Sequence, residues 1–210
     1  MKSESRQLLN EMLKHFSELD YVHPEDIPNI DLYVDQVTTF IDSQLESTKR
    51  NPDDKTLTKT MINNYAKNHI LPPPEKKKYS RDHVLMLIFI YYFKNFMSIS
   101  DVGEILEPLK DNYFGTDSNI SFYDIYSKMV ELESTEARIL VKDMIKKFND
   151  SRGMFTDAPE EDQEMLENFT FICMLGFDVY IKKMMIEEFI DMSKKKHDND
   201  DDKKKEKKDK

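Results

Sequence analysis

The chain has 210 residues, with 31 basic and 41 acidic side chains and a formal net charge of −10. Its four glycines are too few and too scattered for a glycine-rich phosphate loop, and its single cysteine excludes a disulfide framework and a cysteine-based zinc site. The length suits one domain with a sizeable core, or two small domains.

Residues 1–30 form an N-terminal extension that we expect to be partly helical. The opening segment, MKSESRQLLNEM, has no apolar stretch typical of a secretory signal. The longest apolar run, from Val84 to Phe93, is too short to cross a bilayer. We therefore expect a cytoplasmic protein with no membrane partner.

Two helices are predicted in the next part of the chain. Residues 31–46 place apolar side chains at helical spacing, and a turn follows at Asn51–Asp54. Thr58 is a good N-cap for a second helix, which we expect the prolines Pro72–Pro74 to end. Tyr65 of this helix is expected to face the core.

The run VLMLIFIYYF lies in a predicted helix over residues 80–96, with Ser80 as its cap. A buried strand is the competing interpretation of so apolar a run. The length of the segment, the cap and the lack of a bounding glycine favour a central core helix. Ser98 and Asp101 resemble a capping box that starts another amphipathic helix, ending near Leu109.

The C-terminal half is expected to be helical beyond a loop at Asp111–Asn119. Residues 137–148 form a regular amphipathic stripe, and residues 160–192 form a long helical region with a break near Gly176. We expect its methionines to fill a core and Cys173 to be buried. Residues 194–210 carry no apolar side chain and should form a disordered charged tail.

Positive charge is concentrated in residues 55–94, which hold eight basic and two acidic side chains. The segments on both sides are acidic, so this chain should repel nucleic acid except through that one segment. Asparagines such as Asn63 and Asn64 can pair bidentately with adenine. Lysines such as Lys76–Lys78 can bind phosphates.

The run Met61–Pro73, MINNYAKNHILPP, resembles the recognition helix of MerR-like winged helix-turn-helix domains, with the pattern Thr-Ile-Arg-Tyr-Tyr-Glu-x-x-Gly-Leu-Leu-x-Pro. The run KKKYSR that follows is similar to the wing and the entry to the next helix. Asn63 and Asn64 replace the arginine and first tyrosine of the pattern, and His69 replaces its glycine. The sequence is also similar to an uncharacterised bacterial family, domain of unknown function 1836, in which LTKTMINNYxKxxxIPPPxKKKYSR is typical.

The resemblance implies a mainly α chain. A MerR-like winged helix-turn-helix domain would span residues 31–110, and a helical region for dimerisation or effector binding would span residues 120–193. The implied function is sequence-specific DNA binding by a transcriptional regulator, with a recognition helix at about 58–69 and a basic wing at 75–81. The expected DNA contacts are Lys59, Thr60, Asn63, Asn64, Lys67, Lys76, Lys77, Lys78 and Arg81.

The expected partners are double-stranded DNA and a second copy of the chain, with room for a small-molecule effector and no cofactor. The alternative function is that of a helical adaptor whose basic face binds an acidic protein, because the same fold hosts both roles. We do not expect an enzyme. The five histidines are scattered, and neither a metal-ligand spacing nor a nucleophile motif is present.

Overall fold

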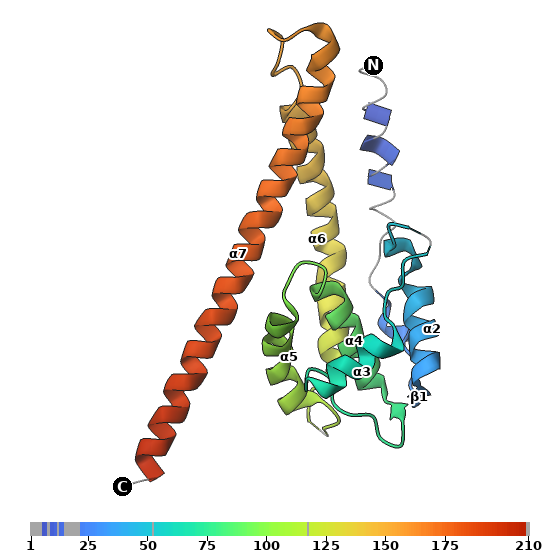
Figure 1. The fold of residues 1–210 in the computed structure, drawn as a ribbon, viewed down its shortest axis with the longest axis vertical. Coiled ribbons are helices and arrows are strands. Elements are labelled where there is room, and N and C mark those ends of the chain that lie inside the picture. The colour runs from blue at the N-terminus through green and yellow to red at the C-terminus, as the bar shows by residue number, and fades with distance from the viewer. Residues whose placement is uncertain are drawn as a thin grey trace.

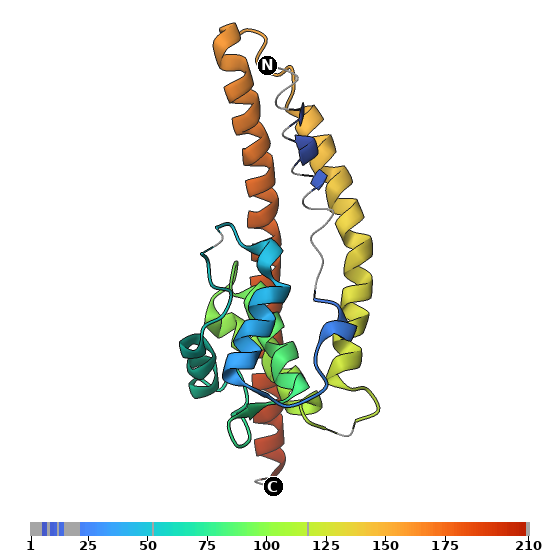
Figure 2. The ribbon, with the colours of Figure 1, turned by 90° about the vertical axis from the view of Figure 1, so that its right-hand side faces the viewer.

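The computed structural model describes residues 22–208 except Pro52 and Asp117, together with Arg6, Gln7, Leu9–Glu11, Leu13 and Lys14. The side chains of Ser134 and of residues 196–208 lie outside the described set. The described chain is mainly helical. It forms a wide domain from which two long helices project side by side (Figure 1, Figure 2).

The described chain consists of helices and two short strands. In chain order they are η1 (Pro24–Asp26), β1 (Leu32–Tyr33), α2 (Val34–Gln44), η2 (Glu46–Thr48), α3 (Lys59–Lys67), β2 (Lys78–Tyr79), α4 (Arg81–Phe93), α5 (Ile99–Tyr113), α6 (Phe122–Asp150) and α7 (Glu160–Lys208). The two strands pair antiparallel, with Leu32 opposite Tyr79.

The apolar helix α4 lies at the centre of the wide domain, as predicted. Its residues from His83 to Tyr91 are all buried, which rules out the strand interpretation. Around it pack buried side chains from every neighbouring helix, including Ile41, Ile62, Leu106 and Tyr126. Each such side chain contributes roughly 1.5–3 kcal/mol of hydrophobic stabilisation.

The helix α3 begins where the sequence predicts but ends earlier. The Thr58 side chain accepts a hydrogen bond from the Met61 N–H at 3.2 Å, which makes Thr58 the N-cap. The helix stops at Lys67, five residues before the prolines that were expected to end it. A Schellman motif ends it instead, because the His69 and Ile70 N–H groups bond back to the Ala66 and Tyr65 carbonyls at 3.2 and 3.0 Å.

The projecting helices α6 and α7 share only a small second core. Among the described residues it consists of Leu9, Phe148 and Phe171, with Leu13 and Leu175 packed against it. The helix α7 then returns to the wide domain, where Ile186 and Ile190 join the main core. The helix α7, which has 49 residues, therefore packs against the rest of the chain at two short segments, one in each core.

The expectations for Cys173, for the methionines and for a break at Gly176 are wrong. Cys173 is exposed, and so are several methionines of α7, because among the described residues the neighbours of this helix lie on one side. Gly176 does not break the helix. The backbone is helical through Lys208. The disordered state expected for residues 194–210 stays a prediction.

Candidate nucleic-acid interface

One face of α3 is polar and exposed. Thr60, Asn63, Asn64 and Lys67 are all exposed, and their spacing of three and four residues places them on the same side of the helix. The opposite side is fixed to the core by Ile62 and Tyr65. The burial pattern thus leaves two amides, a hydroxyl and an ammonium group facing solvent together.

A tight turn carries three exposed lysines between α3 and α4. Lys76 and Lys77 have φ values of 49° and 66°, and the Lys78 N–H bonds to the Glu75 carbonyl at 2.8 Å. These features are typical of a type I′ hairpin turn, in which asparagine and glycine are the preferred central residues. Lysine at both central positions is conformationally costly, so the turn presents charge at the expense of local stability.

Two of the lysines have partners at the surface. Lys59 forms an ion pair with Asp35 in the first turn of α2. The Lys78 Nζ lies 5.7 Å from the centre of the exposed Tyr33 ring, a cation–π contact. Both side chains remain exposed, so a phosphate can compete for them.

Arg81, one of the expected DNA contacts, packs against the domain. Its guanidinium lies 3.5 Å from the centre of the Tyr123 ring and donates to the Pro24 carbonyl at 3.1 Å. The side chain is half-buried and connects the N-terminal segment to α6. These contacts give Arg81 a structural role, and its expected contact with DNA stays a prediction.

Lys94 also turns inward, which lowers the positive charge available at the surface. Its Nζ donates to the Thr56 carbonyl at 2.7 Å, and burial lowers the pKa of its ammonium group. The sequence alone places Lys94 and Arg81 in one basic segment with the turn. Their inward orientation depends on contacts with residues 38 and 57 positions away, which no local pattern reveals.

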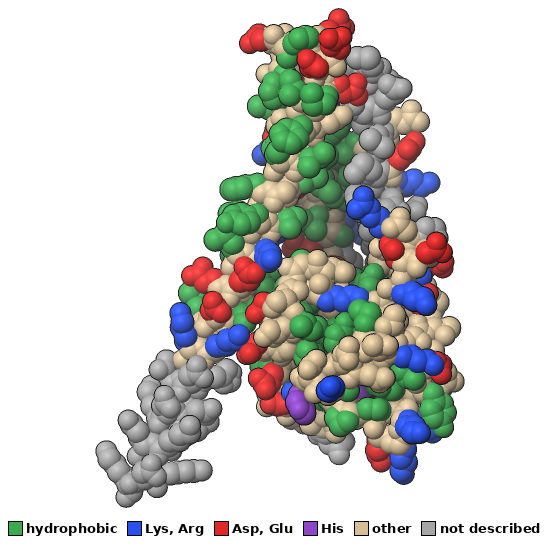
Figure 3. Space-filling model, viewed as in Figure 1, with side chains coloured by type: hydrophobic (Ala, Val, Ile, Leu, Met, Phe, Trp, Pro, Cys, Tyr) green, Lys and Arg blue, Asp and Glu red, His purple; other side chains and the backbone are tan. Residues whose placement is uncertain are grey.

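The polar face of α3 and the lysine turn lie on the same side of the wide domain. In Figure 1 the turn that leads to β2 lies below α3, and in the rotated view of Figure 2 the two again lie near each other. Figure 3 shows Lys and Arg side chains spread over this face. Together Thr60, Asn63, Asn64, Lys67 and Lys76–Lys78, with Lys59 at the edge, make up what we call the basic face.

Two residues that the sequence did not single out support this region. Tyr33 is 53% exposed beside Lys78, and it also begins α2, where its N–H donates to the Gln36 side chain. Lys110 of α5 donates to the His69 carbonyl at 3.1 Å, just beyond the end of α3. Both contacts join segments that are distant in the sequence, so the periodicity of apolar residues along the chain does not predict them.

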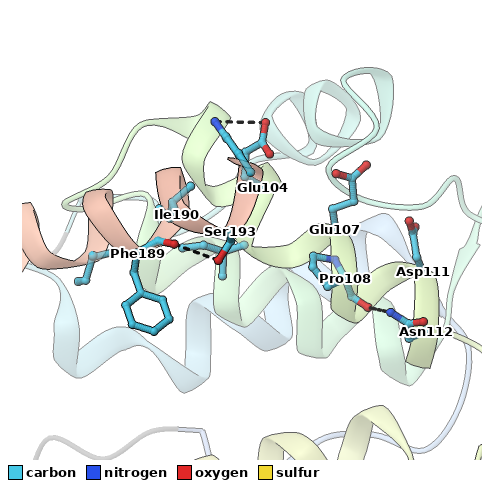
Figure 4. Close-up of a pocket in the computed structure, with 11 residues that line it drawn as sticks. Glu104, Glu107, Pro108, Asp111, Asn112, Phe189, Ile190 and Ser193 are labelled. Carbon is cyan, nitrogen blue, oxygen red and sulfur yellow. Dashed lines mark hydrogen bonds and ion pairs between the residues drawn. The ribbon is translucent and has the colours of Figure 1, made fainter. Parts of the chain in front are cut away.

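A groove with a volume of about 970 Å³ lies between α5 and residues 186–194 of α7. Figure 4 shows Glu104, Glu107 and Asp111 on the α5 side, and Phe189 and Ile190 on the α7 side. An ion pair of 3.4 Å between Glu104 and Lys194 joins the two helices. The acidic and apolar walls distinguish this groove from the basic face.

Comparison with known proteins identifies the wide domain. A family described as a domain of unknown function (DUF1836) matches residues 22–129. The chain belongs to this family. All buried members of the main core except Ile190 fall inside the DUF1836 region, which ends eight residues into α6. No curated protein and no solved structure matches the chain.

Two kinds of feature are missing from the part of the chain that the structure describes. Within it, no helix combines the length and the apolar character that crossing a bilayer requires. The same residues contain no group of three or more His, Cys, Asp or Glu side chains arranged to hold a metal ion.

Proposed function

We propose that this DUF1836 protein is a sequence-specific DNA-binding regulator of the MerR-like winged helix-turn-helix type. The observation that carries the proposal is the juxtaposition of an exposed, amide-bearing helix face on α3 with a turn of three exposed lysines. In this arrangement α3 enters the major groove and the turn contacts the adjacent backbone.

The two parts of the basic face have different tasks in this proposal. Asn63 and Asn64 read base edges, each through a contact that discriminates between bases by about 1–3 kcal/mol. Lys67 and Lys76–Lys78 bind phosphates and fix the register of α3 without reading sequence. The net charge of −10 keeps the other faces of the protein away from DNA.

An effector would have room in the groove between α5 and α7. Its acidic walls favour a ligand with positive charge, and its apolar walls favour a ligand with a hydrocarbon or aromatic body. Such a ligand would act on the orientation of α7 relative to the DUF1836 domain.

Selection of bound fragments from genomic DNA tests the proposal. Wild-type protein should enrich a few sites with a shared motif, and Asn63→Ala should change the motif. Asn149→Ala is the matched control, since Asn149 is an exposed helical asparagine on α6. Enrichment without a motif, or a motif unaffected by Asn63→Ala, would favour the adaptor function, in which the basic face binds an acidic protein.

The salt dependence of DNA binding tests the lysine turn. Replacing Lys76, Lys77 and Lys78 with alanine should weaken binding to all sequences and reduce the logarithmic salt slope by about 0.9 for each phosphate that is no longer neutralised. Replacing Lys128, Lys142 and Lys146 of α6 removes the same charge from exposed positions elsewhere. An equal change of slope in both triple variants would show a general charge effect and remove the turn from the contact surface.

A further inference from the structure

The helix α7 exposes large apolar side chains along most of its length. Eleven of them are between 39% and 76% exposed: Met165, Phe169, Ile172, Phe177, Val179, Tyr180, Ile181, Met184, Met185, Phe189 and Met192. Figure 3 shows hydrophobic side chains gathered along the upper part of α7. Soluble helices normally turn such side chains towards a core.

The exposed side of α7 is also depleted of charge. Residues 165–181 contain only two carboxylates, Glu167 and Asp178. Both point back to the α6 side, because Glu167 pairs with Arg152 at 3.1 Å and Asp178 pairs with Lys147 at 2.6 Å. An apolar centre without charge is typical of the buried part of a protein interface.

A continuous stripe runs along the side opposite these ion pairs. We call Met165, Phe169, Ile172, Cys173, Gly176 and Tyr180 the α7 stripe, since their spacing of three and four residues aligns them on one side of the helix. A Cβ added to Gly176 would meet no atom within 4 Å. Packing within the single chain therefore does not require glycine at position 176. A second helix that approaches α7 closely at this point would require it.

The uncovered area on α7 as a whole reaches that of a standard interface. If a large side chain covers about 150–250 Å², the aromatic range, all eleven leave on the order of 1,000 Å² uncovered, and the four that belong to the α7 stripe leave about 400–500 Å² of this. A standard protein interface buries about 800 Å² per partner. Among the described residues, the second core takes by contrast only two buried residues from α6 and α7, Phe148 and Phe171, and a third, Leu9, comes from the N-terminal segment.

We propose that the α7 stripe is covered by the α7 stripe of a second copy of this chain, so that two α6–α7 hairpins form a four-helix bundle. A second copy supplies a partner of the same length and the same uncharged surface, and a two-fold arrangement brings identical patches together. Two hairpins bury the apolar faces that one hairpin leaves open. A lipid surface fits less well, since residues 160–193 hold nine acidic and two basic side chains, which anionic lipids repel.

This inference does not depend on DNA binding. The α7 stripe lies on the projecting helices, whereas the basic face lies on the DUF1836 domain (Figure 1). Association is therefore measured without DNA, and failure of one proposal leaves the other standing.

Analytical ultracentrifugation of the full chain over a range of concentrations tests the dimer. We expect a species of twice the 25.0 kDa chain mass for the wild type. Ile172→Glu should raise the dimer dissociation constant about a hundredfold. Both copies carry the substitution, so a two-fold interface would bury two unpaired carboxylates. Ile30→Glu is the matched control, since Ile30 is 66% exposed in the wide domain and Ile172 is 63% exposed.

The single cysteine gives a second readout. Cys173 should react slowly with a thiol-specific dye in the wild type and quickly in Ile172→Glu, while circular dichroism should show the same helix content for both. A wild type that is monomeric at every concentration would overturn the proposal and leave the stripe to a different partner. A dimer that survives Ile172→Glu, with Cys173 still reactive, would place the interface elsewhere and overturn it as well.

Discussion

Three residues near the basic face hold a positive φ although none is glycine. They are His69, Lys76 and Lys77, at 60°, 49° and 66°. Each residue of this kind costs of order 1 kcal/mol or more and persists only where the surroundings enforce it. At His69 the Schellman motif supplies that enforcement, at the position where the MerR-like pattern has glycine. At Lys76 and Lys77 the proposed role in DNA binding supplies the reason for lysine.

Replacing Lys76 with asparagine and Lys77 with glycine distinguishes the effect of the turn conformation on stability from the effect of the lysine charges on DNA binding. The pair Asn-Gly fits a type I′ turn without strain, so the free energy of unfolding should rise by about 1–2 kcal/mol. Affinity for DNA should fall at the same time, because the variant lacks two of the proposed phosphate contacts. Urea unfolding and a binding titration measure the two effects.

The double variant Lys76→Ala, Lys77→Ala is the control for this exchange. It removes the same charges without easing the backbone, so it should bind DNA as weakly as the Asn-Gly variant but gain no stability. An Asn-Gly variant that binds DNA as well as wild type would show that the lysines do not contact it.

At the scale of the elements, the N-terminus of α4 depends on a buried histidine. The His83 Nδ1 accepts a hydrogen bond from the Ser80 N–H at 3.0 Å, and its ring packs edge-on against Tyr79 and Phe114. Burial lowers the pKa of His83, although the carbonyls of Pro73 and Pro72 oppose the shift. The helix start, the second strand and the loop after α5 therefore meet at a neutral imidazole.

This arrangement predicts that stability falls in mild acid. The unfolded chain binds a proton near pH 6.5, whereas folded His83 resists it. The contribution of His83 is complete above pH 6.5 and is lost as the pH falls towards the lowered pKa, with a slope of at most about 1.4 kcal/mol per pH unit. Urea unfolding between pH 7.5 and 5.5 measures the slope, and this window lies above the titration of ordinary carboxyls.

His83→Gln is the comparison for the pH series. Its side-chain oxygen can still accept from the Ser80 N–H, but it does not titrate. The variant should therefore show a flatter profile than the wild type over this window. Parallel profiles for the two proteins would assign the pH dependence to other groups.

The elements that can be predicted well from the sequence are those defined by local chemistry. The caps at Thr58 and Ser98, and the apolar run of α4, act within one or two turns. What could not be predicted depends on distant partners. The end of α3 is set by a backbone motif without a glycine, and the inward turn of Arg81 requires Tyr123, 42 positions away. The exposure of Cys173 follows from the lack of a described helix over that side of α7 in the single chain, which an apolar sequence cannot reveal.

Buried apolar side chains are distributed unevenly over the protein. The DUF1836 region holds nearly all of the main core, whereas the second core has three buried residues among those described, of which two are on the projecting helices. Long helices in water gain most of their stability from tertiary packing. The outer part of α6 and α7 should therefore be the less stable part of a single chain.

Hydrogen exchange at several protein concentrations measures this division without a mutation. If a second copy covers the α7 stripe, the amides of residues 165–181 exchange mainly from the monomer. The monomer fraction of a mostly dimeric protein grows as the square root of dilution, so tenfold dilution should speed their exchange about threefold.

The amides of α4 should not respond to dilution, because their protection comes from the core of the same chain. Ile172→Glu should abolish the concentration dependence in residues 165–181 and leave α4 unchanged. Exchange in α7 that is slow and independent of concentration would mean that the single chain stabilises this helix by itself.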